Sequence, residues 1–228
     1  MKNPVFVLVH GAWSGPWCWR DLLTEFERDQ VRATCVSLAS SRDGADPAIA
    51  LEDDVNELVL AIHDLDDVVL VGHSYGGSVV TEAAPRVKGL RRIIYIAALV
   101  PLLGESSTDV ARLVRVRTRL DDAIEVEGGH LRLDPHLAGP ALYGECSATD
   151  RQWAVGKLTS QTVASFRSPR TADSSAAPTL YIKCRNDRAV DPGLQNVLAA
   201  RCDEHLELES DHSPFLSHPQ ELAHALLD

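Results

Sequence analysis

The chain has 228 residues, of which 45% are hydrophobic and 24% are charged, and this balance is typical of one soluble globular domain. It excludes a disordered or fibrous protein as a description of the whole chain. With 22 basic and 33 acidic residues the net charge is −11, which repels phosphate backbones and anionic lipid surfaces, so we expect neither nucleic acid nor a membrane as a partner.

The N-terminal sequence MKNPVFVLVHGAW contains an apolar run that is too short for the core of a signal peptide. No later segment reaches the roughly 18 consecutive apolar residues that a membrane-spanning helix needs. The five cysteines are scattered and form no C-x-x-C pair, which favours free thiols in a reducing compartment. We therefore expect a cytoplasmic protein.

Six short apolar runs, rich in β-branched residues, predict buried parallel strands. Helical periodicity separates them, for example from Val55 to Ile62, and a last helix is expected to begin near Pro219. This alternation predicts an α/β domain, with a mostly parallel sheet of about six strands and helices on both faces. The six runs are Val5–Val9, Val31–Leu38, Val68–Val71, Arg92–Ala97, Thr179–Ile182 and Leu206–Leu208.

The stretch from about Gly104 to Pro178 interrupts the alternation and shows no strong strand pattern. It contains a helical pattern through Trp153 and Leu158. We predict that residues 105–177 form a small cap inserted into a core of residues 1–104 and 178–228, within a single domain. A run of arginines in the cap is expected to form a solvated face, and it comprises Arg112, Arg115, Arg117 and Arg119.

A glycine-rich turn follows the third predicted strand, with the sequence Gly72-His73-Ser74-Tyr75-Gly76-Gly77. The pattern G-x-S-x-G between a strand and a helix is typical of a nucleophilic serine, because the strained turn needs neighbours without a Cβ atom. The pentapeptide alone also fits an ordinary Gly/Ser turn. In its context we interpret Ser74 as the nucleophile and His73 as a packing residue.

A serine hydroxyl needs a base to take its proton and a carboxylate to orient that base, in the chain order serine, acid, histidine. Asp187 follows the fifth predicted strand, and His212 lies in a loop after the sixth. Loops at the carboxyl ends of parallel strands meet at one edge of a sheet, so we expect these side chains to converge on Ser74. Asp191 and Glu105 are alternative carboxylates. The other histidines form no cluster with metal-ligand spacing, and we expect no metal.

Acyl transfer also needs two backbone N–H groups that stabilise a developing oxyanion. We expect one from Tyr75, the residue after the nucleophile, and the other from Ala12, in the loop after the first strand. A phosphate-binding loop is the alternative for this segment, but the pattern G-x-G-x-x-G is absent.

These motifs resemble those of the plant methylesterase and hydroxynitrile lyase family of α/β-hydrolases and their small bacterial relatives. The resemblance spans the sheet-forming parts of nearly the whole chain, and the cap is less distinctive. It implies the α/β-hydrolase fold and a triad of Ser74, Asp187 and His212 that needs no cofactor, with oxyanion donors at Ala12 and Tyr75. The segments that carry it are FVLVHGAW with Trp17 and Trp19 behind it, GHSYGG, CRNDRAVDP and DHSPFLSHPQEL.

Two departures bear on the activity that the resemblance implies. Hydroxynitrile lyases of this family carry a threonine and a lysine where this sequence has Gly11 and Ser213. We therefore expect a serine hydrolase that cleaves a small carboxylic ester through an acyl-enzyme. A lyase of the hydroxynitrile type, and a ligand-binding or receptor protein with weak hydrolysis, are the alternatives.

Aromatic residues near the motifs and in the cap are candidate walls of a substrate pocket. Trp13 and Phe215 flank the oxyanion loop and the histidine, and the cap residues could equally belong to the cap's own core. The partner is expected to be a small-molecule ester, although a lactone or thioester would use the same triad. The oligomeric state stays open, with a homodimer as one option. The substrate-binding candidates are Gly11, Trp13, Tyr143, Trp153 and Phe215.

Overall fold

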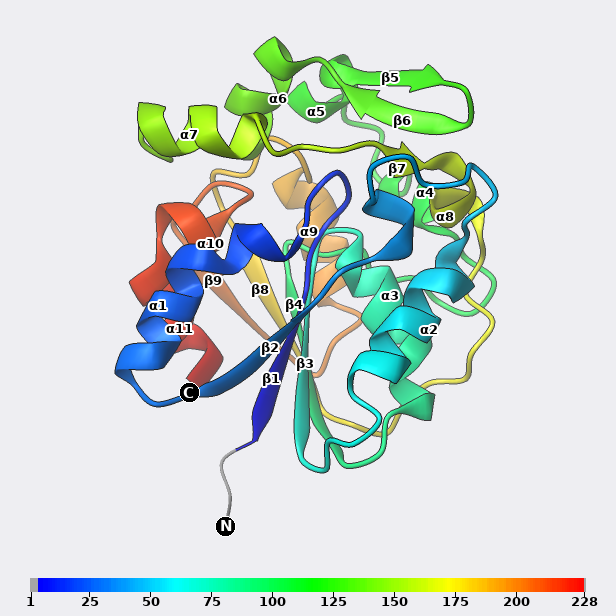
Figure 1. Ribbon diagram of the computed structural model, residues 1–228, viewed down its shortest axis with the longest axis vertical. Helices are drawn as coiled ribbons and strands as arrows, with labels where there is room; N and C mark the ends of the chain where they lie inside the picture. Colours follow the sequence, from blue (N-terminus) through cyan, green and yellow to red (C-terminus); the bar gives the residue numbers. More distant parts are fainter. Residues whose placement is uncertain (1–3, 228) are drawn as a thin grey trace.

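The computed structural model describes residues 4–227 and has a six-stranded sheet at its centre (Figure 1). All its strand pairs are parallel, in the order β2-β1-β3-β4-β8-β9. Each strand overlaps one of the six apolar runs, so the predicted parallel sheet is confirmed. The strands are β1 (Val5–Val9), β2 (Arg32–Val36), β3 (Val68–His73), β4 (Leu90–Ile96), β8 (Thr179–Cys184) and β9 (Glu204–Leu208).

Helices cover both faces of this sheet (Figure 1). On one face α1 (Arg20–Arg28) packs against α11 (Pro219–Leu227), and on the other α2 (Leu51–Ala61) packs against α3 (Gly76–Ala83). Helix α9 (Pro192–Ala199) packs against β8. The shorter helices are η1 (Pro16–Trp19), η2 (Ala39–Ser41), η3 (Ala84–Arg86) and α10 (Pro214–Ser217).

Burial along the strands follows from this layering. Every residue of β1 and β3 is buried, because helices lie on both faces of the central strands. The edge strands β2 and β9 instead include exposed residues. The central strands therefore form the middle of the core, and the loops that carry the candidate site residues begin at their carboxyl ends.

The segment between β4 and β8 forms a cap over the carboxyl ends of the strands (Figure 1). Strands β5, β6 and β7 make a small antiparallel sheet there, within the segment that shows no strong strand pattern in the sequence. These strands have two to four residues and no continuous apolar run, which is why no strand signal is visible. The cap elements are α4 (Ser107–Ala111), α5 (Arg119–Ala123), β5 (Ile124–Glu127), β6 (His130–Leu133), α6 (Pro135–Leu142), α7 (Ala148–Val155), β7 (Gln161–Thr162) and α8 (Val163–Arg167).

The chain leaves the core and returns to it at neighbouring points. The N–H group of Gly104 donates to the carbonyl oxygen of Arg170, and the N–H group of Arg170 donates to that of Glu105. The limits of the cap, residues 105–177, stay a prediction. The four cap arginines are exposed, as expected.

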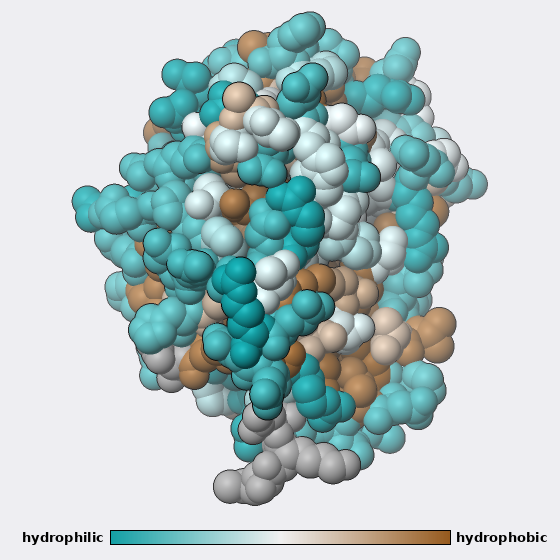
Figure 2. Space-filling model, turned by 60° about the vertical axis from the view of Figure 1, so that its left-hand side comes forward, coloured by the Kyte–Doolittle hydropathy of each residue, from teal (hydrophilic) through white to brown (hydrophobic). Residues whose placement is uncertain are grey.

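The outer surface is mostly polar. Figure 2 shows a face on which hydrophilic residues predominate and apolar side chains form small patches. None of the helices that the structure describes is long and apolar enough to cross a bilayer.

Candidate active site

Ser74 occupies a sharp turn between β3 and α3. Its φ angle of 52° lies in the left-handed region, which is strained for a residue with a side chain. The following helix starts so close to β1 that a Cβ atom at Gly76 would lie 2.5 Å from the carbonyl oxygen of Val9. A glycine is therefore required at position 76, and the geometry matches that of a nucleophile held above a sheet.

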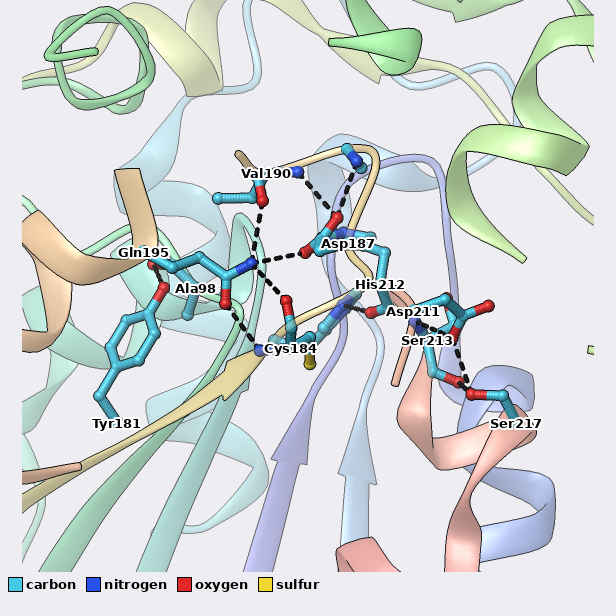
Figure 3. Close-up of polar contacts among 12 residues, drawn as sticks. Ala98, Tyr181, Cys184, Asp187, Val190, Gln195, Asp211, His212, Ser213 and Ser217 are labelled. Atoms are coloured by element: carbon cyan, nitrogen blue, oxygen red, sulfur yellow. Dashed lines mark hydrogen bonds and ion pairs between the residues drawn. The ribbon is translucent and has the colours of Figure 1, made fainter. Parts of the chain in front are cut away.

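Asp187 and His212 are hydrogen bonded to each other (Figure 3). The distance between His212 Nδ1 and Asp187 Oδ2 is 2.8 Å, and both side chains are buried. The other carboxylate oxygen accepts hydrogen bonds from the N–H groups of Ala189 (2.7 Å) and Val190 (2.9 Å). The loop after β8 thus folds around the carboxylate and aims it at the histidine.

The two alternative carboxylates have other partners. Asp191 caps the first turn of α9, where it accepts a hydrogen bond from the N–H group of Gly193. Glu105 forms an ion pair with Arg201, whose hydrogen bond lowers the pKa of the carboxyl against the opposing effect of partial burial. Of the three carboxylates, Asp187 is the one that contacts His212 in the part of the chain that the structure describes.

Gln195, on α9, is hydrogen bonded to the Asp187 carboxylate (Figure 3). It is fully buried, and its Nε2 donates to Asp187 Oδ2 at 3.1 Å and to the carbonyl oxygen of Val190 at 2.9 Å. Its Oε1 accepts from the N–H group of Cys184 at 2.8 Å. This residue was not predicted from the sequence, because a glutamine at a buried helix position has no local signature.

His212 lies beside the nucleophile turn without a hydrogen bond to Ser74 among the described residues. The ring centroids of His212 and His73 are 4.6 Å apart. The carbonyl oxygen of His212 accepts a hydrogen bond from His73 Nε2. Contacts between nucleophile and base are often long without substrate and tighten in the complex.

Two buried residues close to Ser74 have backbone N–H groups without a protein partner in the described part of the chain. Within residues 4–227, the N–H groups of Ala12 and Tyr75 donate no hydrogen bond to a protein acceptor, although both residues are buried. Buried N–H groups are nearly always paired, so an unpaired pair next to a serine is unusual. These are the two donors that the sequence predicts for the oxyanion.

The loop that carries Ala12 is fixed on two sides. His10 Nδ1 donates to the carbonyl oxygen of Gly11 at 2.8 Å, while the N–H group of Leu38 donates to His10 Nε2 at 3.3 Å. Burial lowers the pKa of His10 to about 4, with the hydrogen bond to Gly11 opposing this shift. On the other side, Trp13, with a φ angle of 58°, donates from Nε1 to the carbonyl oxygen of Leu131 in the cap.

Ser74 opens into a mainly apolar cavity of about 100 Å³ between the core and the cap. Of the predicted substrate-binding residues, Trp13 lines this cavity. Gly11 does not line it but lies next to Ser74. The remaining cavity walls are Leu99, Ala111, Val114, Val116, Thr118, Leu120, Asp121, Ile124, Phe166, Ala189, Val190, Asp191 and Leu194.

Tyr143, Trp153 and Phe215 lie outside the lining of this cavity. Trp153 packs edge-on against Trp17, with ring centroids 5.4 Å apart, and lies under the Arg20 guanidinium. Phe215 packs against Trp19 and His73, each at 4.8 Å. Tyr143 is buried at the end of α6. Their role in substrate binding stays a prediction.

The segment between α4 and α5, together with the start of α5, forms one wall of the cavity, a role that was not predicted from the sequence. Val114, Val116, Thr118 and Leu120 line the cavity, and the arginines between them are exposed. The sequence LVRVRTRL carries this alternation with a period of two, which is the signal for an extended segment with one apolar side. The arginine run is therefore the outer side of a pocket wall.

Comparisons with known proteins identify the family and the fold. The alpha/beta hydrolase family matches residues 6–225. A carbendazim hydrolyzing esterase of Nocardioides sp. is 33% identical over 175 residues, which cover 72% of this chain and 72% of that protein. A norfluorocurarine synthase of Strychnos sp. is 30% identical over 257 residues, which cover 98% of this chain and 94% of that protein.

Solved structures give the same result. A methylesterase from Arabidopsis matches with a TM-score of 0.82 and 26% sequence identity, covering 98% of this chain and 97% of that chain. The predicted fold and the resemblance to the methylesterases are confirmed.

Proposed function

Because the chain belongs to the alpha/beta hydrolase family, we propose that it hydrolyses a small carboxylic ester through Ser74, His212 and Asp187. One observation carries the proposal: the hydrogen bond between His212 and Asp187 lies beside a serine with a positive φ angle. The similarity to proteins named as an esterase and a methylesterase supports the reaction type. The expected cytoplasmic location stays a prediction.

The hydrogen bonds support a specific role for each group in the proposed mechanism. His212 donates from Nδ1 to Asp187, so its Nε2 carries the lone pair that takes the proton of Ser74. Ser74 Oγ then bonds to the ester carbonyl carbon, and the carbonyl oxygen becomes an oxyanion that the N–H groups of Ala12 and Tyr75 stabilise.

The tetrahedral intermediate collapses when the bond to the alcohol oxygen breaks and His212 returns its proton to that oxygen. The alcohol leaves. Water, deprotonated by His212, then attacks the acyl-enzyme, and the carboxylic acid leaves as Ser74 regains its proton. The cavity beside Ser74 receives an apolar part of the ester, since most of its lining residues are apolar.

The threonine that is typical of the hydroxynitrile lyases does not fit at position 11 of this site. A Cβ atom at Gly11 would lie 2.9 Å from Ser74 Cβ and from His73 Nδ1. A threonine at position 11, as in the hydroxynitrile lyases, therefore requires both neighbours to move.

The test compares wild type with Ser74→Ala on a graded series of p-nitrophenyl and methyl esters, with mandelonitrile as an added substrate. We expect ester turnover that falls by about 10⁴-fold or more in Ser74→Ala. Ser37→Ala, which changes an exposed serine directly after β2, serves as a matched control. An unchanged rate in Ser74→Ala would overturn the proposal, cyanide release would favour a lyase, and an inactive folded wild type would favour a binding protein.

A further inference from the structure

Asp54, on α2, is a fully buried carboxylate outside the proposed triad. Its Oδ1 accepts a hydrogen bond from the N–H group of Ser40 at 2.9 Å, and its Oδ2 accepts from Ser40 Oγ and, at 2.7 Å, from the hydroxyl group of Tyr75. No cation pairs with it in the described part of the chain. A buried charge of this kind is costly unless hydrogen bonds satisfy it.

The partner Tyr75 is the residue whose backbone N–H group is proposed to stabilise the oxyanion. Its ring is completely buried and stacks on Phe166, with centroids 5.0 Å apart and planes inclined by 16°. The ring is held on its face by Phe166 and at its hydroxyl end by Asp54. Because the side chain and the N–H group share one Cα atom, fixing the ring restricts the orientation of the donor.

The same cluster reaches into the cap. Gln161, on β7, donates from Nε2 to Ser40 Oγ at 2.7 Å and to Ser165 Oγ at 2.6 Å, and its Oε1 accepts from Ser41 Oγ at 2.6 Å. Gln161 is fully buried, and Phe166 follows a few residues later on α8. The part of the cap that carries Phe166 is therefore linked, through Gln161 and Ser40, to the Asp54 carboxylate that accepts the hydrogen bond of the Tyr75 hydroxyl group.

We propose that Asp54 is a positioning residue that orients the Tyr75 oxyanion donor and couples it to the docked cap. The inference rests on the proposed hydrolase mechanism. A carboxylate suits this position because its two oxygens receive three donors from two different segments. Burial raises the pKa of Asp54, and the hydrogen bonds from Ser40 and Tyr75 oppose this shift because they favour the carboxylate form.

The alternative is a purely structural cluster, which would affect folding without affecting the transition state. Tyr75→Phe removes only the hydroxyl group and keeps the ring stack. Asp54→Asn leaves one acceptor oxygen for three donors. Tyr95→Phe is the matched control, because it removes another buried tyrosine hydroxyl, which is hydrogen bonded to Thr81 at 2.9 Å.

The experiment measures kcat and KM on one p-nitrophenyl ester for these variants and for the double variant. It also measures inhibition by a trifluoromethyl ketone, which forms an oxyanion on Ser74, and by the related alcohol, which does not. We expect about a tenfold loss of kcat in each single variant with KM changed less than threefold. Inhibition by the ketone should weaken by a similar factor, and inhibition by the alcohol should stay unchanged.

The kcat of the double variant should be no lower than that of the less active single variant, because both changes remove the hydrogen bond between Asp54 and the Tyr75 hydroxyl group. Tyr95→Phe should match wild type. The inference is overturned if either single variant keeps kcat within twofold of wild type, or if ketone and alcohol weaken equally. Failure of the proposed function has a different signature, which is ester turnover that survives Ser74→Ala or is absent in wild type, and it would overturn this inference as well.

Discussion

The side chain of His73 donates a hydrogen bond from Nε2 to the carbonyl oxygen of His212 at 2.9 Å. The residue before the proposed nucleophile therefore holds the backbone of the proposed base. His73 Nδ1 is buried without a partner in the described structure. Burial, helped by the nearby His212, lowers the pKa of His73 well below its usual value, which keeps the ring neutral and its single proton on Nε2.

His73→Phe should therefore lower kcat about tenfold with little change in KM. Phenylalanine keeps the ring contacts with Trp19 and Phe215 but cannot hold His212. His130→Phe is the control, because it removes a similar bond from a histidine ring to the carbonyl oxygen of Ala45 in the cap contact. Steady-state kinetics check this, and equal losses in the two variants would contradict a specific role for His73.

Gly11→Ala should lower kcat/KM by about a hundredfold. The added Cβ atom would lie 2.9 Å from Ser74 Cβ, so the oxyanion loop and the nucleophile turn must move apart. Gly139→Ala is the control, because its Cβ atom would meet nothing closer than 3.4 Å. Kinetics on a p-nitrophenyl ester measure the effect, and a Gly11→Ala enzyme with near wild-type rates would count against the proposed position of the Ala12 donor.

Leu120→Ala should shift the ester preference toward longer acyl chains. The cavity of about 100 Å³ is small compared with the roughly 300–1,000 Å³ of typical ligand sites, and Leu120 forms part of its wall. The measurement is kcat/KM from p-nitrophenyl acetate to octanoate. Leu137→Ala, at an exposed cap position, should keep the wild-type profile. If Leu120→Ala also keeps that profile, this cavity does not hold the acyl group.

The free energy of unfolding should fall as the pH falls from about 6.5 toward 4. Burial lowers the pKa of His10 from 6.5 to about 4, so in this range the unfolded chain binds the proton and the folded chain does not. Above pH 6.5 the His10 ring is neutral in both states and does not lower the free energy of unfolding. At pH 4 its protonation in the unfolded chain lowers that free energy by about 3 kcal/mol.

Urea unfolding of wild type and His10→Asn between pH 7.5 and 4.5 measures the contribution of His10. The variant should show a shallower fall, since it lacks the titrating ring, whereas His136→Asn, at an exposed site, should follow wild type. Parallel curves for wild type and His10→Asn would contradict the predicted linkage.

The parallel sheet, and the loops at its carboxyl edge that hold the proposed catalytic residues, could be predicted from sequence patterns alone. The run Val5–Val9 is β1 to the residue, and the elbow around Ser74 is a local pattern in which strand, glycines and helix lie within a few positions. Such signals are readable because apolar periodicity and steric demands act between neighbours in the chain.

Most contacts between the core and the cap could not be predicted in this way. Ser40 and Gln161 are 121 positions apart and share a hydrogen bond, and no local pattern in the sequence encodes that pairing. Trp153 lies against Trp17 and not in the cavity lining. Strands β5 and β6, whose residues are exposed or half-buried, are stabilised by pairing with each other. Contacts of this kind depend on how the cap folds back over the sheet, since burial and pairing are properties of the assembled layers.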